Sequence, residues 1–334
     1  MTSVLGLDFG GTKLAAGLVD AYSGAILARV RCPTPTTGGA SASIAAMLEL
    51  AHTLLSQANI DTRSSAHGAA APGQASLASV GVSFGGPVEA DGRTVRLSMH
   101  VPGWEGMALA DRLEREFGVP ALIANDGDAA ALAEYRFGAG RGVRHLLYLT
   151  VSTGIGGGVI VDGRLHRGER AWAGEVGHMV LKPDGPPCPC GRNGCLESLA
   201  SGLSVARAAR EWLRHPPPAH ADGSTRSVLA TIAPDQITAR DVAEAAAQGD
   251  PLARFVWDAA MDWLGIGISS AANLLNPGRV VLGGGLTRAG MLLFEPVRRV
   301  AAQRALDPAL EVVPAALADD VGILGGAALM LEQR

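Results

Sequence analysis

The first sixty residues alternate between short apolar runs and turn-forming residues before a longer apolar stretch. Apolar runs at residues 4–8, 14–19 and 25–30 predict three strands separated by turns. Residues 43–57 carry apolar side chains at helical spacing and predict an amphipathic helix. Three consecutive strands joined by short turns form a meander, so the sheet is expected to be mixed rather than purely parallel.

The remainder of the chain alternates between segments with strand periodicity and segments with helix periodicity. The further predicted strands are 78–83, 121–124, 146–152, 159–162, 279–282 and 310–313. The further predicted helices are 109–117, 129–137, 203–213, 239–247, 252–275, 292–303 and 323–332. Strands alternating with helices indicate an α/β protein. The segment 216–227 is rich in proline and polar residues and is predicted to be an insertion.

The length and net charge of the chain limit the classes of protein to which it can belong. A chain of 334 residues exceeds what one hydrophobic core usually holds, so two lobes are expected. The net charge of −4 and the lack of a basic patch argue against a nucleic-acid partner. The apolar stretch 255–275 carries Asp258 and Asp262, which favours a buried core helix over a membrane span. The first residues do not resemble a secretory signal, so a cytoplasmic location is expected.

A cysteine-rich loop is the most specific local pattern. Cys188, Cys190 and Cys195 fall within eight residues, and His178 stands ten positions before the first of them. Three thiolates and one imidazole form a donor set that suits a structural Zn²⁺ site. The Cys-x-Cys spacing is tighter than usual, and reduced unligated thiols or a redox loop remain alternatives. Cys32 stands alone and is expected to behave as a small buried hydrophobe.

Three glycine-rich loops follow predicted strands. They are 8–13 (Asp-Phe-Gly-Gly-Thr-Lys), 152–158 (Ser-Thr-Gly-Ile-Gly-Gly-Gly) and 283–285 (Gly-Gly-Gly). Glycine lets a backbone approach a phosphate closely, and Thr12 and Lys13 add a hydroxyl and a cation. The first loop is not a P-loop, because no helix follows it. The first loop alone is more often a plain hairpin, and each loop is weak evidence singly, but together they favour a nucleotide cleft between two lobes.

Several polar side chains are candidates for the chemistry. Asp126 follows a predicted strand, where open α/β sheets place ligands, and is a candidate base. The alternative is a helix N-cap, a role that Asp128 could also fill. Glu175 and Glu197 flank the cysteine loop and could hold a polar ligand such as a sugar, or could be solvated surface charges. Trp104 and Trp172 are predicted to be core residues, with stacking on a sugar as the alternative.

These motifs together resemble the ROK family of bacterial sugar kinases. The matching features are the Asp-x-Gly-Gly-Thr-Lys loop, Asn125-Asp126, the Gly-Glu-x-Gly-His run 174–178, and the cysteine loop with Glu197. The order holds from residue 4 to the end of the chain, and the metal loop is highly specific to that family. Some members are repressors with an added N-terminal helix-turn-helix. Here the phosphate loop begins at residue 8, so an enzyme is expected.

The resemblance implies an α/β, actin-like ATPase (ribonuclease H-like) fold with two lobes, mixed sheets and a ligand cleft. The small lobe is expected at 1–124 plus 321–334, and the large lobe at 125–320. The implied nucleotide-binding residues are Asp8, Gly10, Gly11, Thr12, Lys13, Thr153, Gly154, Gly156, Gly157, Gly284 and Gly285. The implied sugar-binding residues are Gly85, Gly86, Asn125, Asp126, Glu175, His178 and Glu197. The implied metal ligands are His178, Cys188, Cys190 and Cys195.

The resemblance implies ATP-dependent phosphorylation of a hexose, glucose first, at its 6-hydroxyl. Asp126 would be the general base, Mg²⁺ would accompany ATP with Asp8 in support, and Zn²⁺ would be structural. The alternatives are a kinase for N-acetylglucosamine, N-acetylmannosamine or fructose, and a non-catalytic sugar sensor. His100 stands where many relatives carry asparagine, which leaves the sugar open. A homo-oligomer, dimeric or tetrameric, is expected, with sugar and ATP as small-molecule partners.

Overall fold

The computed structural model describes residues 2–60, 76–98, 101–215 and 227–332. His100 and all but the last residue of the predicted insertion 216–227 lie outside these ranges. Contacts divide the chain into two compact units. The first comprises Met1–Val143, Gly158–Gly174 and Ala316–Arg334, and the second Arg144–Gly157 and Glu175–Ala315.

These compact units do not follow the boundaries predicted at 124/125 and 320/321. Helix α3 (Asp126–Phe137) packs against α9 (Val321–Glu332), and α9 also packs against the strands β1 (Thr2–Phe9) and β4 (Ser76–Phe84). Both helices therefore belong to the first unit as a whole. The division into a small and a large lobe stays a prediction.

The sheet of the first unit confirms the mixed arrangement. Its strands are β1 (Thr2–Phe9), β2 (Lys13–Asp20), β3 (Ile26–Pro33), β4 (Ser76–Phe84) and β5 (Ala121–Asn125), in the order β3-β2-β1-β4-β5. The β1–β2 and β2–β3 pairs are antiparallel, as expected of a meander. The β1–β4 and β4–β5 pairs are parallel, because a crossover through helix separates each pair in the chain.

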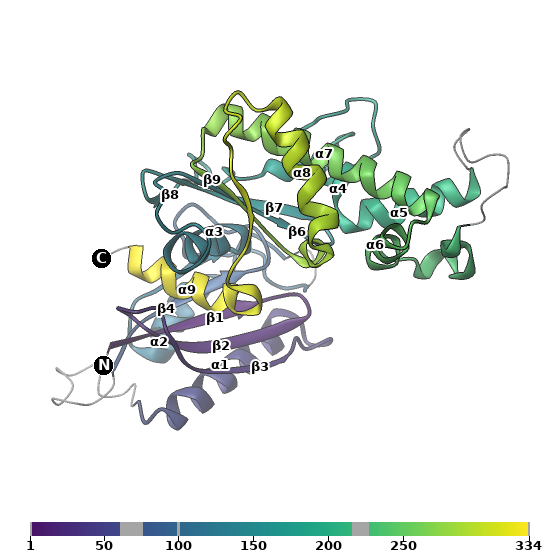
Figure 1. Cartoon of the computed structure of the whole chain (residues 1–334). Helices are drawn as coiled ribbons and strands as arrows, with labels where there is room; N and C mark the ends of the chain where they lie inside the picture. The colour runs from purple at the N-terminus through teal and green to yellow at the C-terminus, as the bar shows by residue number, and fades with distance from the viewer. Residues whose placement is uncertain (1, 61–75, 99–100, 216–226, 333–334) are drawn as a thin grey trace. The chain divides into compact units, whose positions relative to one another are not determined.

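Helices cover both faces of this sheet (Figure 1). Side chains alternate along β1, so Leu5 and Leu7 join the core shared with α1 (Gly39–Gln57) and α2 (Leu109–Phe117). Val4 points to the other face and joins the core shared with α3 and α9. Burying a sheet on both faces is the usual arrangement where parallel strands are present.

A second sheet consists of β6 (Leu146–Val151), β7 (Ile155–Val161), β8 (Arg164–Leu165), β9 (Arg279–Gly283) and β10 (Val312–Pro314), in the order β10-β9-β6-β7-β8. Strands β6, β9 and β10 lie in the second unit, and β8 lies in the first. Strand β9 runs parallel to both β6 and β10, whereas β7 and β8 are antiparallel. The division between the units falls within β7. Strand β7 begins earlier than the predicted 159–162, because the glycine run is itself extended and paired.

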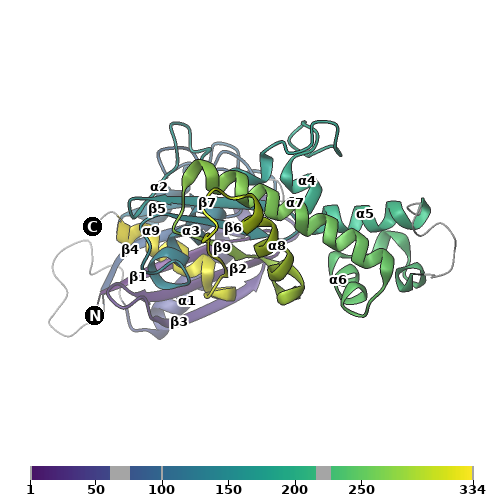
Figure 2. The same ribbon diagram turned by 45° about the horizontal axis from the view of Figure 1, so that its top comes forward.

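The helices of the second unit gather around α7 (Pro251–Leu275), which packs against each of the others (Figure 2). These are α4 (Leu196–Ala200), α5 (Gly202–Arg214), α6 (Ala239–Ala247) and α8 (Met291–Arg304). Short 3₁₀ turns span Val176–His178, Val228–Thr231, Pro234–Gln236, Gly285–Ala289 and Ala318–Asp320. Within the described ranges, the molecule contains no helix with the length and apolarity to span a bilayer.

Candidate functional site

In the first unit, three neighbouring parallel strands end at the same level. Phe9 of β1 pairs with Phe84 of β4, and Phe84 pairs with Asn125 of β5. The segments that follow these residues are the first glycine loop, Gly85-Gly86 and Asp126. The structure therefore brings these three predicted segments together at one edge of one sheet, the edge where open α/β sheets place ligands.

The first glycine loop is a tight hairpin. The amide of Gly10 donates to the carbonyl of Lys13 at 3.1 Å, and the hydroxyl of Thr34 donates to the carbonyl of Gly10 at 2.7 Å. Gly11 and Thr12 form the exposed tip. A backbone fixed in this way presents its tip without further ordering, which suits recognition of a charged group.

The position of the helix cap separates the roles of Asn125 and Asp126. Asn125 is the N-cap of α3: its Oδ1 accepts from the amide of Gly127 at 2.9 Å, and its Nδ2 donates to the carbonyl of Gly86 at 3.0 Å. Asp126 is the first residue of the helix, and its exposed carboxylate also accepts from Gly127 at 2.9 Å. Asn125 therefore fills the capping role, while Asp126 is an exposed residue at the positive end of the helix.

Asp8, at the end of β1, is electrostatically linked to Asp126. The pKa of the Asp8 carboxyl is raised from 3.8 to about 6, chiefly by burial and also by the charge of Asp126. The ammonium of Lys13 opposes this change, as does a hydrogen bond from the hydroxyl of Ser83. Two carboxylates that repel one another beside a lysine form a setting in which a divalent cation would be favoured.

In the second unit, the other two glycine loops meet at one sheet edge. Thr150 of β6 pairs with Gly283 of β9, so the second and third loops follow adjacent parallel strands. Gly284 has φ 89°, and a Cβ there would lie 2.5 Å from the carbonyl oxygen of Val151. Only glycine therefore lets the third loop lie flat against the end of β6. The predicted loop residues Gly156 and Gly157 lie within β7.

The second glycine loop is held by the segment that follows the cysteine loop. Glu197, in the first turn of α4, accepts through Oε2 from the amide of Ile155 at 2.9 Å. The amide of Gly202 donates to the carbonyl of Ser152 at 2.7 Å. One oxygen of Glu197 is thus engaged in positioning the loop, a connection that the sequence pattern did not reveal.

The four predicted metal ligands converge. The ligand atoms of His178, Cys188, Cys190 and Cys195 all lie within 4.8 Å of one another. The Sγ of Cys188 lies 3.6 Å from Nδ1 of His178, and the Sγ atoms of Cys190 and Cys195 are 3.6 Å apart. Tetrahedral zinc with bonds of about 2.0–2.3 Å places its ligand atoms roughly 3.5–3.8 Å apart, so this donor set fits the ion.

Burial and hydrogen bonding shift the pKa values of the three thiols of the cluster in different directions. Burial raises the pKa of Cys188 to about 12 and raises that of Cys195. A backbone hydrogen bond from Arg192 instead lowers the pKa of the exposed Cys190 to about 6. The second ring nitrogen of His178, Nε2, lies 3.9 Å from Oε2 of Glu175, so imidazole and carboxylate face one another. A metal on Nδ1 would leave Nε2 available for such a polar partner.

Trp104 lies in the core as predicted, whereas Trp172 does not. Trp104 is buried and packs edge-on against Phe9 and Phe84, as predicted. Trp172 is 52% exposed, with the guanidinium of Arg96 5.1 Å from its ring centre. The prediction of a core position for Trp172 was wrong, because an arginine rather than apolar neighbours covers this ring.

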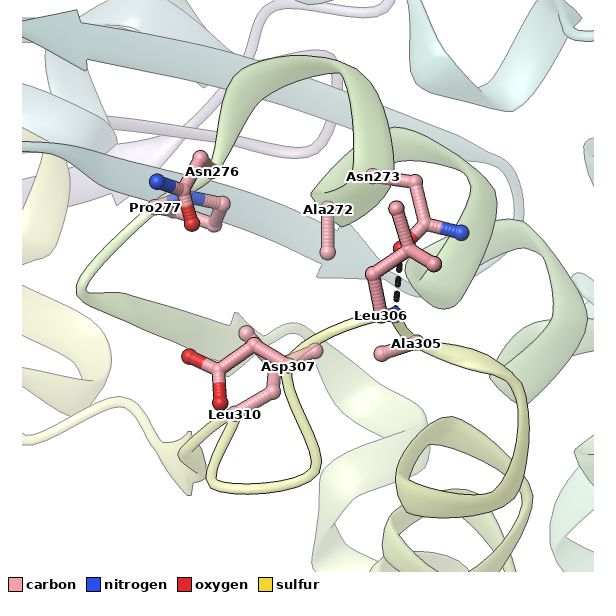
Figure 3. Close-up of a pocket in the computed structure, with 8 residues that line it drawn as sticks. All are labelled: Ala272, Asn273, Asn276, Pro277, Ala305, Leu306, Asp307 and Leu310. Carbon is pink, nitrogen blue, oxygen red and sulfur yellow. Dashed lines mark hydrogen bonds between the residues drawn. The ribbon is translucent and has the colours of Figure 1, made fainter.

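A separate hollow lies on the second unit between the end of α7 and the loop after α8 (Figure 3). The side chain of Asn273 accepts from the amide of Leu306 at 2.8 Å at its rim. Its lining residues are Ala272, Asn273, Asn276, Pro277, Ala305, Leu306, Asp307 and Leu310. None of these lining residues is a predicted site residue.

Comparison with known proteins agrees with the motifs over the full length. The chain is 33% identical over 339 residues to a glucokinase of Streptomyces coelicolor, covering 99% of this chain and 98% of that protein. It is 34% identical over 335 residues to a glucokinase of Thermotoga maritima, with the same coverage. The solved ROK family glucokinase of Streptomyces griseus, in complex with glucose and AMPPNP, is 32% identical with a TM-score of 0.76, covering 99% of this chain and all of that one.

The predicted actin-like, two-lobed α/β class is confirmed by these full-length structural neighbours and by the two mixed sheets. The model of the ROK family matches residues 4–333. This chain therefore belongs to the ROK family.

Proposed function

We propose that this protein is an ATP-dependent hexose kinase that phosphorylates glucose at its 6-hydroxyl. Glucokinases similar over nearly the whole chain support the activity. The observation that carries the chemical assignment is the exposed carboxylate of Asp126, on the sheet edge that also bears the first glycine loop and Gly85-Gly86. A base and a phosphate-binding backbone on one edge are what phosphoryl transfer to an alcohol needs.

In the proposed step, the 6-hydroxyl oxygen of the sugar attacks the γ-phosphorus in line. Asp126 accepts the hydroxyl proton as the new O–P bond forms. The bond from the γ-phosphorus to its bridging oxygen breaks, and ADP leaves with that electron pair. Positioning and charge neutralisation would supply most of the acceleration.

The remaining residues would hold the two substrates. Asn125 is fixed by its own hydrogen bonds to Gly86 and Gly127, so its remaining hydrogen-bonding capacity points in a set direction. The predicted sugar ligands Glu175, His178 and Glu197 would bind hydroxyls from the second unit. Two loops would bind the phosphates of ATP. The residues of the first are Gly10, Gly11, Thr12 and Lys13, and those of the second are Thr153, Gly154, Gly156 and Gly157. Gly284 and Gly285 would adjoin the adenosine.

Two metals fit the residues present. Zn²⁺ on His178 and the three cysteines would cross-link the loop that leads into α4, and its four protein ligands would leave no open position for chemistry. Mg²⁺, when bound with ATP, would neutralise phosphate charge. Asp8 would support it through water.

A coupled ADP-release assay over a panel of hexoses tests the function. Glucose, mannose, fructose, N-acetylglucosamine and N-acetylmannosamine are each supplied with ATP and Mg²⁺. We expect glucose to give the highest kcat/KM. An N-acetylhexosamine giving the highest value would overturn the choice of sugar. Sugar binding without ADP release from any member of the panel would indicate a sensor.

A further inference from the structure

The chain that leads into Glu175 forms a closed loop on the first unit. The amide of Ala173 donates to the carbonyl of Arg167 at 3.0 Å, so residues 167–173 turn back on themselves. This loop follows strand β8 and lies within Gly158–Gly174, a part of the first unit. What holds the loop, and which side chain it exposes, therefore bears on the predicted site.

One arginine of the loop attaches it to helix α3. Nε of Arg167 lies 4.0 Å from Oδ2 of Asp128, a buried residue two positions after Asp126 in the first turn of α3. A Cβ on Gly92 would lie 3.3 Å from Nη1 of Arg167, so the guanidinium also packs against the turn at Gly92. The loop is thereby attached to the turn of α3 that begins with the proposed base.

A second arginine attaches the loop to the segment after strand β4. The amide of Arg96 donates to the carbonyl of Pro87, directly after Gly86, at 3.0 Å. The guanidinium of Arg96 donates through Nη2 to the carbonyl of Arg170 at 3.1 Å, and its Nε lies 2.9 Å from Oε2 of Glu89. The loop is thus also attached to the segment that carries Gly86.

The two points of attachment are themselves linked. Nδ2 of Asn125, the cap of α3, donates to the carbonyl of Gly86 at 3.0 Å. The loop 167–173, the segment 85–87 and the start of α3 therefore form one connected group. All three belong to the first unit, so this arrangement does not depend on the second.

Trp172 is the large apolar side chain that this loop exposes. The residue is 52% exposed, and the guanidinium of Arg96 lies over its ring at 5.1 Å from the ring centre. Because Arg96 is itself held by Glu89 and by the carbonyl of Arg170, the ring has a fixed orientation. A large ring that is both exposed and oriented is ready to contact a ligand without further ordering.

The chemistry of the ring matches a pyranose. A hexopyranose with equatorial hydroxyls presents C–H groups on both faces and hydroxyls at its rim. The face of an indole carries partial negative charge, which attracts C–H groups polarised by the oxygens beside them. The rim hydroxyls are left for polar partners, and small-molecule sites commonly combine aromatic surface with a few placed polar groups.

A nucleotide base would also stack on such a ring. The predicted adenosine residues Gly284 and Gly285, however, belong to the second unit. The contacts that hold Trp172 lead instead to Gly86 and to the first turn of α3, where the predicted sugar-binding residues of the first unit lie. The sugar is therefore the favoured occupant.

We propose that Trp172 is a specificity-determining residue whose indole ring binds one C–H face of the hexopyranose that accepts the phosphoryl group. The proposal rests on the proposed function and specifies how its acceptor is recognised. A stacking contact is made equally in the ground state and in the transition state, so it should act on KM rather than on kcat.

The test compares Trp172→Ala and Trp172→Phe with the control Trp212→Phe. Trp212 packs edge-on against Phe255 in the second unit and is not a predicted site residue. Tryptophan fluorescence is titrated with glucose and, separately, with AMPPNP. Calorimetry gives the Kd for glucose, and steady-state kinetics give kcat and KM. Thermal unfolding confirms that each variant is folded.

We expect glucose to change the fluorescence of the unmodified protein and of Trp212→Phe, but not that of Trp172→Phe. Trp172→Ala should raise the Kd and KM for glucose on the order of tenfold, with kcat within about twofold of normal. Trp172→Phe should recover most of this affinity, because phenylalanine also presents an aromatic face.

Normal glucose affinity in folded Trp172→Ala would overturn the proposal and leave the kinase function standing. A fluorescence change that AMPPNP alone produces, and that Trp172→Phe abolishes, would assign the ring to the nucleotide and also overturn it. Failure of the proposed function is distinguishable, since glucose would then bind without release of ADP while fluorescence and calorimetry still test the ring. An unmodified protein that binds neither glucose, mannose nor N-acetylglucosamine would overturn the proposal.

Discussion

At the scale of single residues, the central question is whether Asp126 acts as the base or as the cap of helix α3. Asn125 takes the cap of α3 and leaves Asp126 exposed, so the alternative reading of Asp126 as the cap is answered by geometry. Neither motif nor spacing could decide this, because asparagine and aspartate cap helices equally well. The hydrogen bond from Asn125 to the carbonyl of Gly86 comes from another strand, and sequence alone does not supply it.

Replacing Asp126 with asparagine removes the proposed base while keeping its size. We expect Asp126→Asn to lose on the order of a hundredfold or more in kcat and to bind glucose with near-normal affinity. Asp128→Asn, which removes a charge from the same helical turn, is the control and should retain most of the activity. Steady-state kinetics and calorimetry measure both variants. A near-normal turnover in Asp126→Asn would remove this residue as the base.

Asp8 should make the stability of the protein depend on pH when no ligand or Mg²⁺ is present. Its pKa is about 6 in the folded chain against 3.8 unfolded, so its ionisation opposes folding above pH 6, and the penalty fades as the pH falls toward 4. Asp8→Asn should therefore stabilise the protein at pH 7.5 by up to about 3 kcal/mol more than at pH 4.

Urea unfolding of both proteins at the two pH values checks this expectation for Asp8. Lys13, Arg31 and Asp126, whose charges act on the Asp8 carboxyl, are present in both proteins, so the comparison isolates position 8. A stability difference that is the same at both pH values would show that Asp8 ionises normally in the fold.

At the scale of elements, the strands and long helices follow from periodicity, and the short ones do not. Helix α7 spans Pro251–Leu275 where 252–275 was predicted, because its apolar face is long and Asp250 caps it. Helix α4, of five residues, was missed, since it is too short to show a period. It nevertheless carries Glu197 and links the cysteine loop to the second glycine loop.

That link predicts a consequence of losing the metal. Cys190→Ala should release zinc and weaken glucose binding on the order of tenfold or more, because the loop that orients His178 and Glu197 loses its cross-link. Cys32→Ala, on strand β3 of the first unit, should keep both properties. Metal analysis and calorimetry provide the readouts. Unchanged glucose affinity in zinc-free Cys190→Ala would refute a supporting role for the metal.

At the scale of the whole molecule, the predicted site residues fall into two groups, one on each compact unit. The first group follows β1, β4 and β5, and the second surrounds the cysteine cluster and the ends of β6 and β9. The motifs indicated these residues by their places at strand ends and in loops, and their binding and catalytic roles stay predictions. The division of the chain into compact units was harder to predict from the sequence, because it depends on the packing of α3 against α9.

The most direct measurement is ³¹P NMR of the product formed from ATP, Mg²⁺ and glucose. We expect a phosphomonoester resonance coupled to the two hydrogens on C6, accumulating in step with ADP and nearly absent with Asp126→Asn. Accumulation of inorganic phosphate in place of sugar phosphate, or phosphorylation at another carbon, would contradict this expectation.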